Sequence, residues 1–240
     1  MEVGLQLYSV RDVTEGDLPG TLRKVARMGY QAVEFAGFFG HSAEDVAQML
    51  ADCGLKAHGT HTGLSELTEH FSDTVHFHQL IGCEEIIIPW ADLTSREKLD
   101  RFLESTATLS AQLLKEGLRL GYHNHADEFK RNEDGSVAFD ELSRADALFL
   151  EIDTFWAFAA GRDPVALLKG LHSRVPVIHI KDGLKDGSGK PLGLGEAPVK
   201  AVWQTARELG MRMVVESETL TPDGLTAAQT CIDYLRALEV

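Results

Sequence analysis

Three consecutive apolar segments in the C-terminal half of the chain end in side chains that can bind a metal ion. The segments are LFLEIDTFW (148–156), VPVIHIKDG (175–183) and RMVVESE (212–218), and the side chains are Asp153, His179 and Glu216. In a parallel barrel the strand ends meet at one mouth, so these side chains would meet there. Two carboxylates and an imidazole suit a hard or borderline divalent cation. The pattern therefore predicts a metal-dependent enzyme.

A fourth segment, LRLGYHNHADEF (118–129), adds His123, His125 and Glu128. We predict Glu128 as the fourth metal ligand, and His123 is the alternative. The HNH triplet (123–125) is too polar for a strand end that has no functional role. Those of its side chains that do not bind metal are therefore expected to contact substrate hydroxyl groups.

Structural roles compete with these predictions. Asp153 could cap a helix that begins at Thr154, which is a common use of aspartate. A lone histidine such as His179 is often a hydrogen-bonded core residue, but its match with Asp153 and Glu216 at equivalent strand ends favours the metal site. Lys181 could pair with Glu151, or it could stabilise an enolate or alkoxide.

Glu216 is the main candidate for proton transfer. A carboxylate bound to a cation is a weaker base, so we expect it to bind through one oxygen and to leave the other for the substrate. His123 and Glu151 are candidate acid/base partners.

Further residues near strand ends are predicted to contact the substrate. Glu34 ends an early strand, and His58 and His61 flank the next one. The aromatic residues could stack on the face of a sugar or simply cover the core, and they are Tyr8, Trp90 and Trp156. The glycine-rich loop 183–195 lacks a nucleotide-binding pattern and is expected to act as a mobile lid.

Size and composition favour a single barrel domain over residues 1–240. The 240 residues include 44% hydrophobic ones, and the formal net charge is −14. An acidic chain is a poor partner for nucleic acid. Three scattered cysteines, no signal peptide and no membrane-spanning segment predict a cytoplasmic protein without membrane partners.

Apolar segments alternate with amphipathic ones in eight units, which predicts a single (β/α)8 TIM barrel. Expected strands cover 3–8, 32–36, 55–61, 84–90, 118–123, 147–153, 175–181 and 212–217. Expected helices cover 18–28, 43–52, 65–81, 95–116, 137–144, 164–171, 198–209 and 224–238. An open doubly wound sheet is disfavoured because no phosphate fingerprint follows the first strand.

The chain resembles the sugar phosphate isomerase/epimerase family, with its xylose-isomerase-like barrel. The similar blocks are LQLYSVRD (5–12), VEFAG (33–37), GYHNHADEF (121–129), LEIDTFWAFAAGRDPVALL (150–168) and HIKDG (179–183). The resemblance implies one divalent cation held by Glu128, Asp153, His179 and Glu216. Epimerase members place a glutamate where this chain has His123, which weakens the case for two-base epimerisation.

The resemblance implies an isomerase or epimerase that acts on a small keto-sugar or polyol by proton abstraction next to a carbonyl. The cation could be Mn²⁺, Mg²⁺, Co²⁺ or Zn²⁺, and a homodimer is possible. The alternative is a metal-dependent lyase, either an inosose-type dehydratase or an enzyme that eliminates from 3-keto-glycosides. More remote alternatives are an apurinic endonuclease-like enzyme and a non-catalytic sugar-binding barrel.

Overall fold

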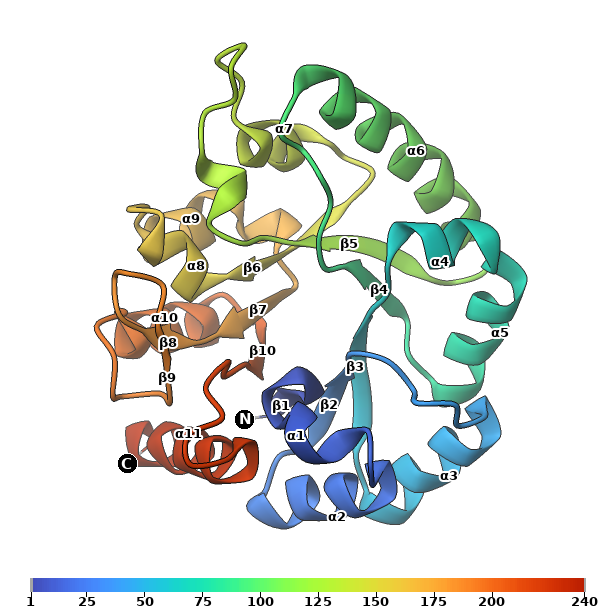
Figure 1. The fold of residues 1–240 in the computed structure, drawn as a ribbon, viewed down its shortest axis with the longest axis vertical. Coiled ribbons are helices and arrows are strands. Elements are labelled where there is room, and N and C mark those ends of the chain that lie inside the picture. The colour runs from blue at the N-terminus through green and yellow to red at the C-terminus, as the bar shows by residue number, and fades with distance from the viewer. Residues whose placement is uncertain (1, 240) are drawn as a thin grey trace.

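The computed structural model describes residues 2–239, and these form a closed barrel of eight parallel strands (Figure 1). The order around the ring is β1-β10-β7-β6-β5-β4-β3-β2, so β1 closes the barrel against β10. The predicted (β/α)8 barrel is confirmed. The barrel strands are β1 (Val3–Gln6), β2 (Ala32–Phe35), β3 (Lys56–His61), β4 (Glu85–Ile88), β5 (Arg119–His123), β6 (Phe149–Asp153), β7 (Val177–Ile180) and β10 (Arg212–Val215).

Helices follow the strands and cover the outside of the barrel (Figure 1). The predicted helix 65–81 is two helices that meet at His70, and Gly63 precedes the first, which begins at Leu64. Short 3-10 turns are η1 (Leu7–Val10), η2 (Asp127–Phe129) and η3 (His172–Arg174). The α-helices are α1 (Arg11–Thr14), α2 (Leu18–Met28), α3 (Ala43–Cys53), α4 (Leu64–Glu69), α5 (Phe71–Ile81), α6 (Arg96–Lys115), α7 (Ala138–Arg144), α8 (Thr154–Ala159), α9 (Pro164–Leu171), α10 (Val199–Glu208) and α11 (Gly224–Leu238).

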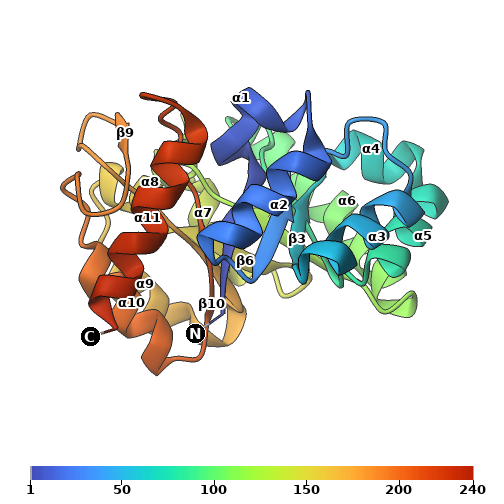
Figure 2. The ribbon, with the colours of Figure 1, turned by 90° about the horizontal axis from the view of Figure 1, so that it is seen from below.

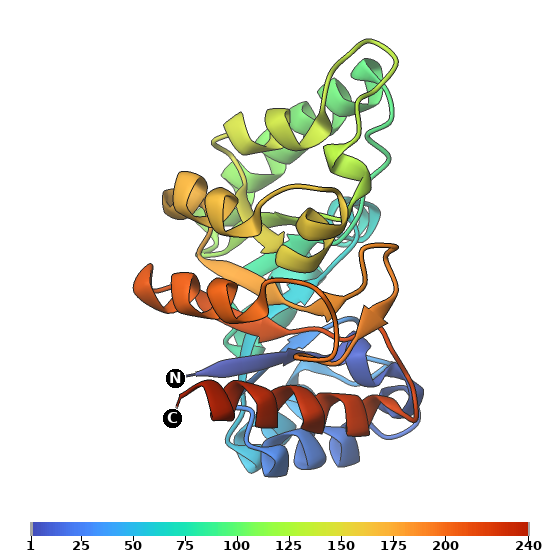
Figure 3. The same ribbon diagram turned by 90° about the vertical axis from the view of Figure 1, so that its left-hand side faces the viewer.

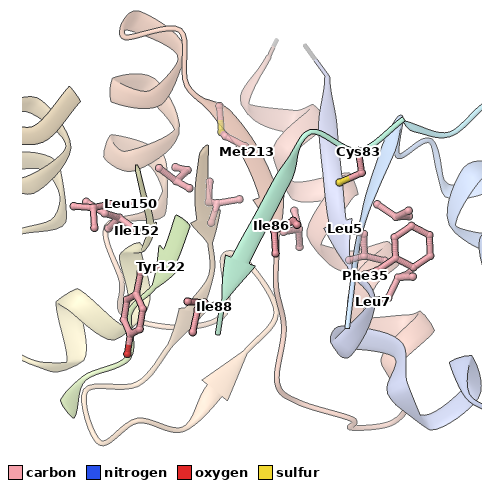
Figure 4. Packing of buried hydrophobic residues seen from close by; sticks show 14 of the residues in the cluster. Leu5, Leu7, Phe35, Cys83, Ile86, Ile88, Tyr122, Leu150, Ile152 and Met213 are labelled. Atoms are coloured by element: carbon pink, nitrogen blue, oxygen red, sulfur yellow. The ribbon is translucent and has the colours of Figure 1, made fainter. Parts of the chain in front are cut away.

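The main apolar core lies between the strands and the surrounding helices. Alternate strand residues such as Leu5, Ile86 and Ile152 are fully buried there (Figure 4). Burying one such side chain contributes about 1.5–3 kcal/mol to folding. Because side chains alternate along a strand, the residues on either side of Ile152 point into the barrel lumen.

The lumen itself has an apolar layer below a polar one. Ile87, Phe149, Val177 and Val214 form a separate buried cluster. Gly121 makes space for it, since a Cβ atom there would lie 2.4 Å from the Phe149 ring. This layer closes the lumen beneath the side chains that end the strands.

The two ends of the barrel differ. Strand β1 begins and α11 ends at the same end (Figure 3), and α11 packs beside α2, which joins the last unit to the first (Figure 2). The small hairpin of β8 (Asp182–Gly183) and β9 (Gly189–Lys190) lies at the opposite end, where the strands finish (Figure 3). Within residues 2–239, no helix is both long and apolar enough to cross a bilayer.

Candidate functional site

A pocket of about 570 Å³ opens at the mouth where the strands finish. Its lining combines aromatic, imidazole and carboxylate side chains. Seven predicted site residues line it, and they are Tyr8, His61, Trp90, His123, His125, Trp156 and Glu216. Ala36, Pro89 and Glu218 complete the lining. Tyr8 and Trp90 are 45% and 63% exposed, so their rings form an open rim.

Four side chains from neighbouring strands meet under this pocket, and we call them the outer cluster: His123, Asp153, His179 and Glu216. One ligand atom from each lies within 4.8 Å of the others, and all four residues are buried. Glu216 Oε2 is 3.2 Å from His179 Nδ1, and Asp153 Oδ2 is 3.9 Å from His123 Nε2. The barrel register creates this group, since His179 pairs with Asp153 on β6 and with Val214 on β10.

Asp153 fills both roles that the sequence allowed. Its Oδ1 accepts a hydrogen bond of 2.8 Å from the Trp156 backbone N–H, which caps α8. Its Oδ2 is buried without a hydrogen bond from any described residue and lies 3.5 Å from Lys181 Nζ. The cap therefore orients the carboxylate and leaves one oxygen facing the outer cluster.

The structure does not bring Glu128 to the outer cluster. Its Oε1 accepts a hydrogen bond of 2.7 Å from the Tyr122 hydroxyl, and its Oε2 accepts one of 2.8 Å from the His125 backbone N–H. Both oxygens are thus engaged in holding the loop after β5. His123, the alternative fourth ligand, stands beside Asp153 instead.

Two further carboxylates, Glu34 and Glu151, lie fully buried against the same histidines, and we call them the inner carboxylates. Glu151 Oε2 is 2.9 Å from His61 Nε2, 3.1 Å from His123 Nδ1 and 3.2 Å from His179 Nε2. Glu34 Oε2 is 2.7 Å from His179 Nε2. His123 and His179 therefore face the inner carboxylates with one ring nitrogen and the outer cluster with the other.

These contacts set the charge of the histidines. Burial alone would lower the pKa of His61, but the charges of Glu34 and Glu151 outweigh it and raise that pKa to about 10. The pKa of His179 is raised well above its usual range in the same way, against the effect of burial. Burial and the neighbouring His179 charge lower the pKa of His123 to about 3, so His123 is neutral.

The carboxylates respond to burial and to their cationic partners. Burial would raise the pKa values of Glu151 and Glu216, but adjacent cations hold both well below the usual range; His179 dominates for Glu151 and Lys181 for Glu216. Burial raises the pKa of Asp153 despite the nearby Lys181. Asp153 is therefore the carboxylate of the outer cluster that is least compensated by its neighbours.

Lys181 is fully buried among carboxylates of the site. Its Nζ lies 3.1 Å from Glu216 Oε2 and also donates to Glu218 Oε1, and it stands 4.8 Å from the Trp156 ring centroid. Burial would lower the pKa of Lys181, but Glu216, Asp153 and Glu218 raise it, so the ammonium stays charged. The possible pairing with Glu151 is replaced by these contacts.

Sequence reasoning missed Glu218 as a site residue. It lines the pocket and bonds to Lys181. The available signal was its spacing of two from Glu216, which places both side chains on one face of an extended segment.

The structure does not bring His58 to the mouth. Its Nε2 is 2.6 Å from Glu2 Oε1, in a pocket that includes Glu85 and Arg212. The apolar layer of the lumen separates this pocket from the site. The predicted substrate contact by His58 thus finds no support in the geometry, whereas the remaining predicted residues gather at the mouth or directly beneath it.

The family model for the xylose isomerase-like TIM barrel matches residues 22–238. The chain belongs to this family. A solved structure of a sugar phosphate isomerase/epimerase from Parabacteroides distasonis is 25% identical, with a TM-score of 0.86 over 98% of this chain and 97% of the other. None of the curated proteins is close enough to count as a match.

Two more distant structures share the fold but differ in activity. The probable 3-DHS dehydratase AsbF of Bacillus anthracis is 13% identical, with a TM-score of 0.79 over 98% of this chain and 99% of the other. An L-ribulose 3-epimerase is 15% identical, with a TM-score of 0.77 over 99% of this chain and 94% of the other. The same fold thus occurs in an epimerase and in a probable dehydratase.

Proposed function

We propose that the chain is a divalent-metal-dependent isomerase or epimerase that acts on a small keto-sugar or related polyol. The main support is the outer cluster, four convergent ligand atoms at the base of a pocket with an aromatic rim. The likeness to a sugar phosphate isomerase/epimerase at 25% identity supports the same reaction class.

The side chains of the outer cluster suit a divalent cation. Asp153 Oδ2 is a buried acceptor without a hydrogen bond from the described residues, and neutral His123 has a lone pair available. Metal bonds of about 2.0–2.2 Å to such ligands place ligand atoms at most about 4.4 Å apart, and the four ligand atoms of the outer cluster all lie within 4.8 Å of one another. A bound divalent ion would polarise a substrate carbonyl and favour its enediolate.

The protein side chains would move and hold the proton. Glu216 contacts His179 and Lys181 through Oε2 and lines the pocket, so its other oxygen can take the proton next to the carbonyl. His125 lines the same pocket and can return a proton. The charged ammonium of Lys181 stabilises negative charge that develops on the substrate.

Glu151 and His123 would act together. Glu151 Oε2 accepts a hydrogen bond from the Nδ1–H group of His123, which leaves the Nε2 lone pair on the side of Asp153. Carboxylate partners fix ligand histidines in this way in many metal sites. We therefore propose that Glu151 positions His123 and His179 and does not itself touch the substrate.

Elimination is the second candidate. The pocket takes its two lining carboxylates, Glu216 and Glu218, from the same segment after β10. Carboxylate bases that lie on one side of the pocket suit the removal of a single proton from the substrate, followed by the loss of water or of a glycosidic group. The fold similarity to a probable dehydratase supports this candidate at the level of fold.

The test is solvent-deuterium exchange into keto-sugars and inososes with Mn²⁺, Mg²⁺ or Co²⁺. Glu216→Gln keeps the shape and one oxygen ligand but removes the base, so exchange should fall about 100-fold or more while metal is partly retained. The exposed Glu208→Gln is the matched control. If exchange in Glu216→Gln equals that of the wild type, Glu216 is not the base. If no wild-type preparation shows metal-dependent exchange or elimination, the proposed function is wrong.

A further inference from the structure

We infer that the mouth pocket takes an uncharged polyhydroxylated substrate and rejects its phosphorylated and carboxylated analogues. The inference rests on the proposed function, because it assumes that this pocket is the active site. Its first support is the lining, in which no residue is lysine or arginine among the described residues. Enzymes usually hold a phosphate or carboxylate with such side chains, often arginine in a bidentate pair.

The charge around the pocket is negative. Glu216 and Glu218 line it, and Glu34, Glu151 and Asp153 lie beneath. Lys181 is buried and its ammonium already contacts Glu216, Asp153 and Glu218. The five carboxylates outnumber the positive charges of Lys181, His61 and His179 by two, and one divalent cation would offset this excess. The two carboxylates that line the pocket, Glu216 and Glu218, lie nearest to an incoming ligand, so an anion placed beside them is disfavoured and its affinity is selectively lowered.

The arginine at the rim is also committed elsewhere. Arg11 stacks on the Tyr8 ring at 4.1 Å from its centroid. Its Nη1 donates a 2.8 Å hydrogen bond to the Tyr8 carbonyl, and its Nη2 donates a 3.0 Å bond to the Glu218 carbonyl. The guanidinium thus supports the rim from behind and does not join the pocket lining.

The glycine-rich loop after β7 binds an internal anion instead of an external one. Backbone N–H groups from this loop converge on the buried carboxylate of Asp182. The donors are Gly183 (2.8 Å), Gly193 (2.9 Å), Gly195 (3.0 Å) and Ala197 (3.1 Å). Convergent backbone N–H groups are a common phosphate cradle. Here the Asp182 carboxylate already occupies the cradle, so these backbone N–H groups do not bind an anionic substrate.

The rest of the pocket suits a neutral sugar. The rings of Tyr8, Trp90 and Trp156 offer apolar faces for sugar C–H groups, and His61, His123 and His125 offer polar contacts for hydroxyl groups. The volume of about 570 Å³ lies within the range of about 300–1,000 Å³ typical of ligand pockets.

The test compares matched pairs of ligands on the Mn²⁺-loaded protein by titration calorimetry. In each pair the neutral member is a ketohexose and the charged member is its 1- or 6-phosphate, and neutral inososes, the carboxylate 3-dehydroshikimate and inorganic phosphate are separate probes. We expect the charged member of each pair to bind at least about 100-fold more weakly, a difference of about 2.7 kcal/mol. Equal or tighter binding of the charged members, or binding of no neutral member, would overturn the inference.

A charge-removing variant sharpens the test. Glu218→Gln removes one lining carboxylate and releases Lys181, so discrimination against phosphate should shrink by about tenfold. Glu208→Gln, exposed on α10, should leave it unchanged. Discrimination that is identical in Glu218→Gln and wild type would refute the electrostatic origin. If metal-dependent exchange is faster with a sugar phosphate than with the neutral sugar, this inference is wrong and the proposed function is supported. If neutral sugars bind but no exchange occurs with any ligand, the proposed function is wrong and the preference for neutral ligands remains.

Discussion

Replacing Lys181 with methionine should weaken the protein chiefly when no metal is bound. Its ammonium is fully buried and lies 3.1 Å from Glu216 and 3.5 Å from Asp153. Removing one partner of a buried ion pair costs about 3–5 kcal/mol, because the charge left behind is uncompensated. For a chain of this size, about 1 kcal/mol shifts the melting temperature by about 2–4 °C. We therefore expect a loss of about 6–20 °C in metal-free protein.

A divalent cation in the outer cluster should restore most of that loss. The cation would supply positive charge to the same two carboxylates, and Lys181→Met would also remove a cation that repels it. At the effective dielectric constant of about 20 that applies to such sites, this repulsion is large enough for the variant to bind Mn²⁺ at least about tenfold more tightly.

The assay is thermal unfolding followed by circular dichroism, with and without saturating Mn²⁺, together with a metal titration. The matched control is Lys24→Met, which removes an exposed lysine from α2 and should change neither quantity. The reasoning fails if Lys181→Met melts like the wild type without metal. It also fails if Mn²⁺ raises the melting temperature by the same amount in both proteins.

Three further outcomes are expected. Asp153→Asn keeps an oxygen to cap α8 but replaces an anionic ligand by a neutral one. Loss of even an outer-shell partner costs about 10–100-fold in metal affinity, so this variant should bind metal at least about 100-fold more weakly. Elemental analysis that shows full occupancy together with a native circular dichroism spectrum would contradict the site. Burial lowers the pKa of His78 below its ordinary value of 6.5, so the neutral form stabilises the fold above that pH, and the stabilisation is lost as pH falls through the depressed pKa. The free energy of unfolding, measured with urea, should therefore fall more between pH 7.5 and pH 5.5 in the wild type than in His78→Gln. These pH values lie about one unit on either side of the ordinary histidine pKa. Equal decreases in the two proteins would contradict this prediction. Gly121→Ala places a Cβ atom 2.4 Å from the Phe149 ring and should cost about 1–3 kcal/mol, whereas Gly170→Ala, with open space in α9, should be neutral or stabilising, so equal urea midpoints for the two would refute the packing argument.

The repeating pattern made the fold predictable. Apolar residues with a period of two define the strands, and capping residues mark where the helices between the strands begin. Ser95, for example, accepts a hydrogen bond from the Lys98 backbone N–H and caps α6, close to the start of the expected helix 95–116. The division of one expected helix at His70 was not visible, because the apolar pattern continues across it.

The outer cluster was largely predictable because a closed parallel barrel brings strand ends together. Asp153, His179 and Glu216 end neighbouring strands, so chain order fixed their proximity. The fourth position was not determined by topology. Glu128 lies in a loop, and the choice between it and His123 depends on hydrogen bonds to Tyr122 and His125 that spacing does not reveal.

His58 was misplaced because it lies three residues before His61, the last residue of β3. The register with β2 passes from Val33–Ala57 to Glu34–Gly59 and skips His58. A bulge of this kind adds a residue to one strand and breaks the two-residue period. Three residues span about 10 Å along a strand, so His58 lies beside Glu2 near the start of the strands and His61 lies beside Glu151 near their end.

The position of Glu151 changes how the site should be understood. As a strand-end carboxylate it could have been an acid or a base at the substrate, yet it lies fully buried beneath His61, His123 and His179. A carboxylate there cannot reach the pocket without displacing those rings. It can, however, hold the far nitrogens of the rings and so decide which nitrogen faces the outer cluster. If the cation binds at the outer cluster as proposed, we expect its affinity to depend on Glu151 through the histidines that Glu151 contacts, and loss of Glu151 should alter metal binding before it alters any proton transfer.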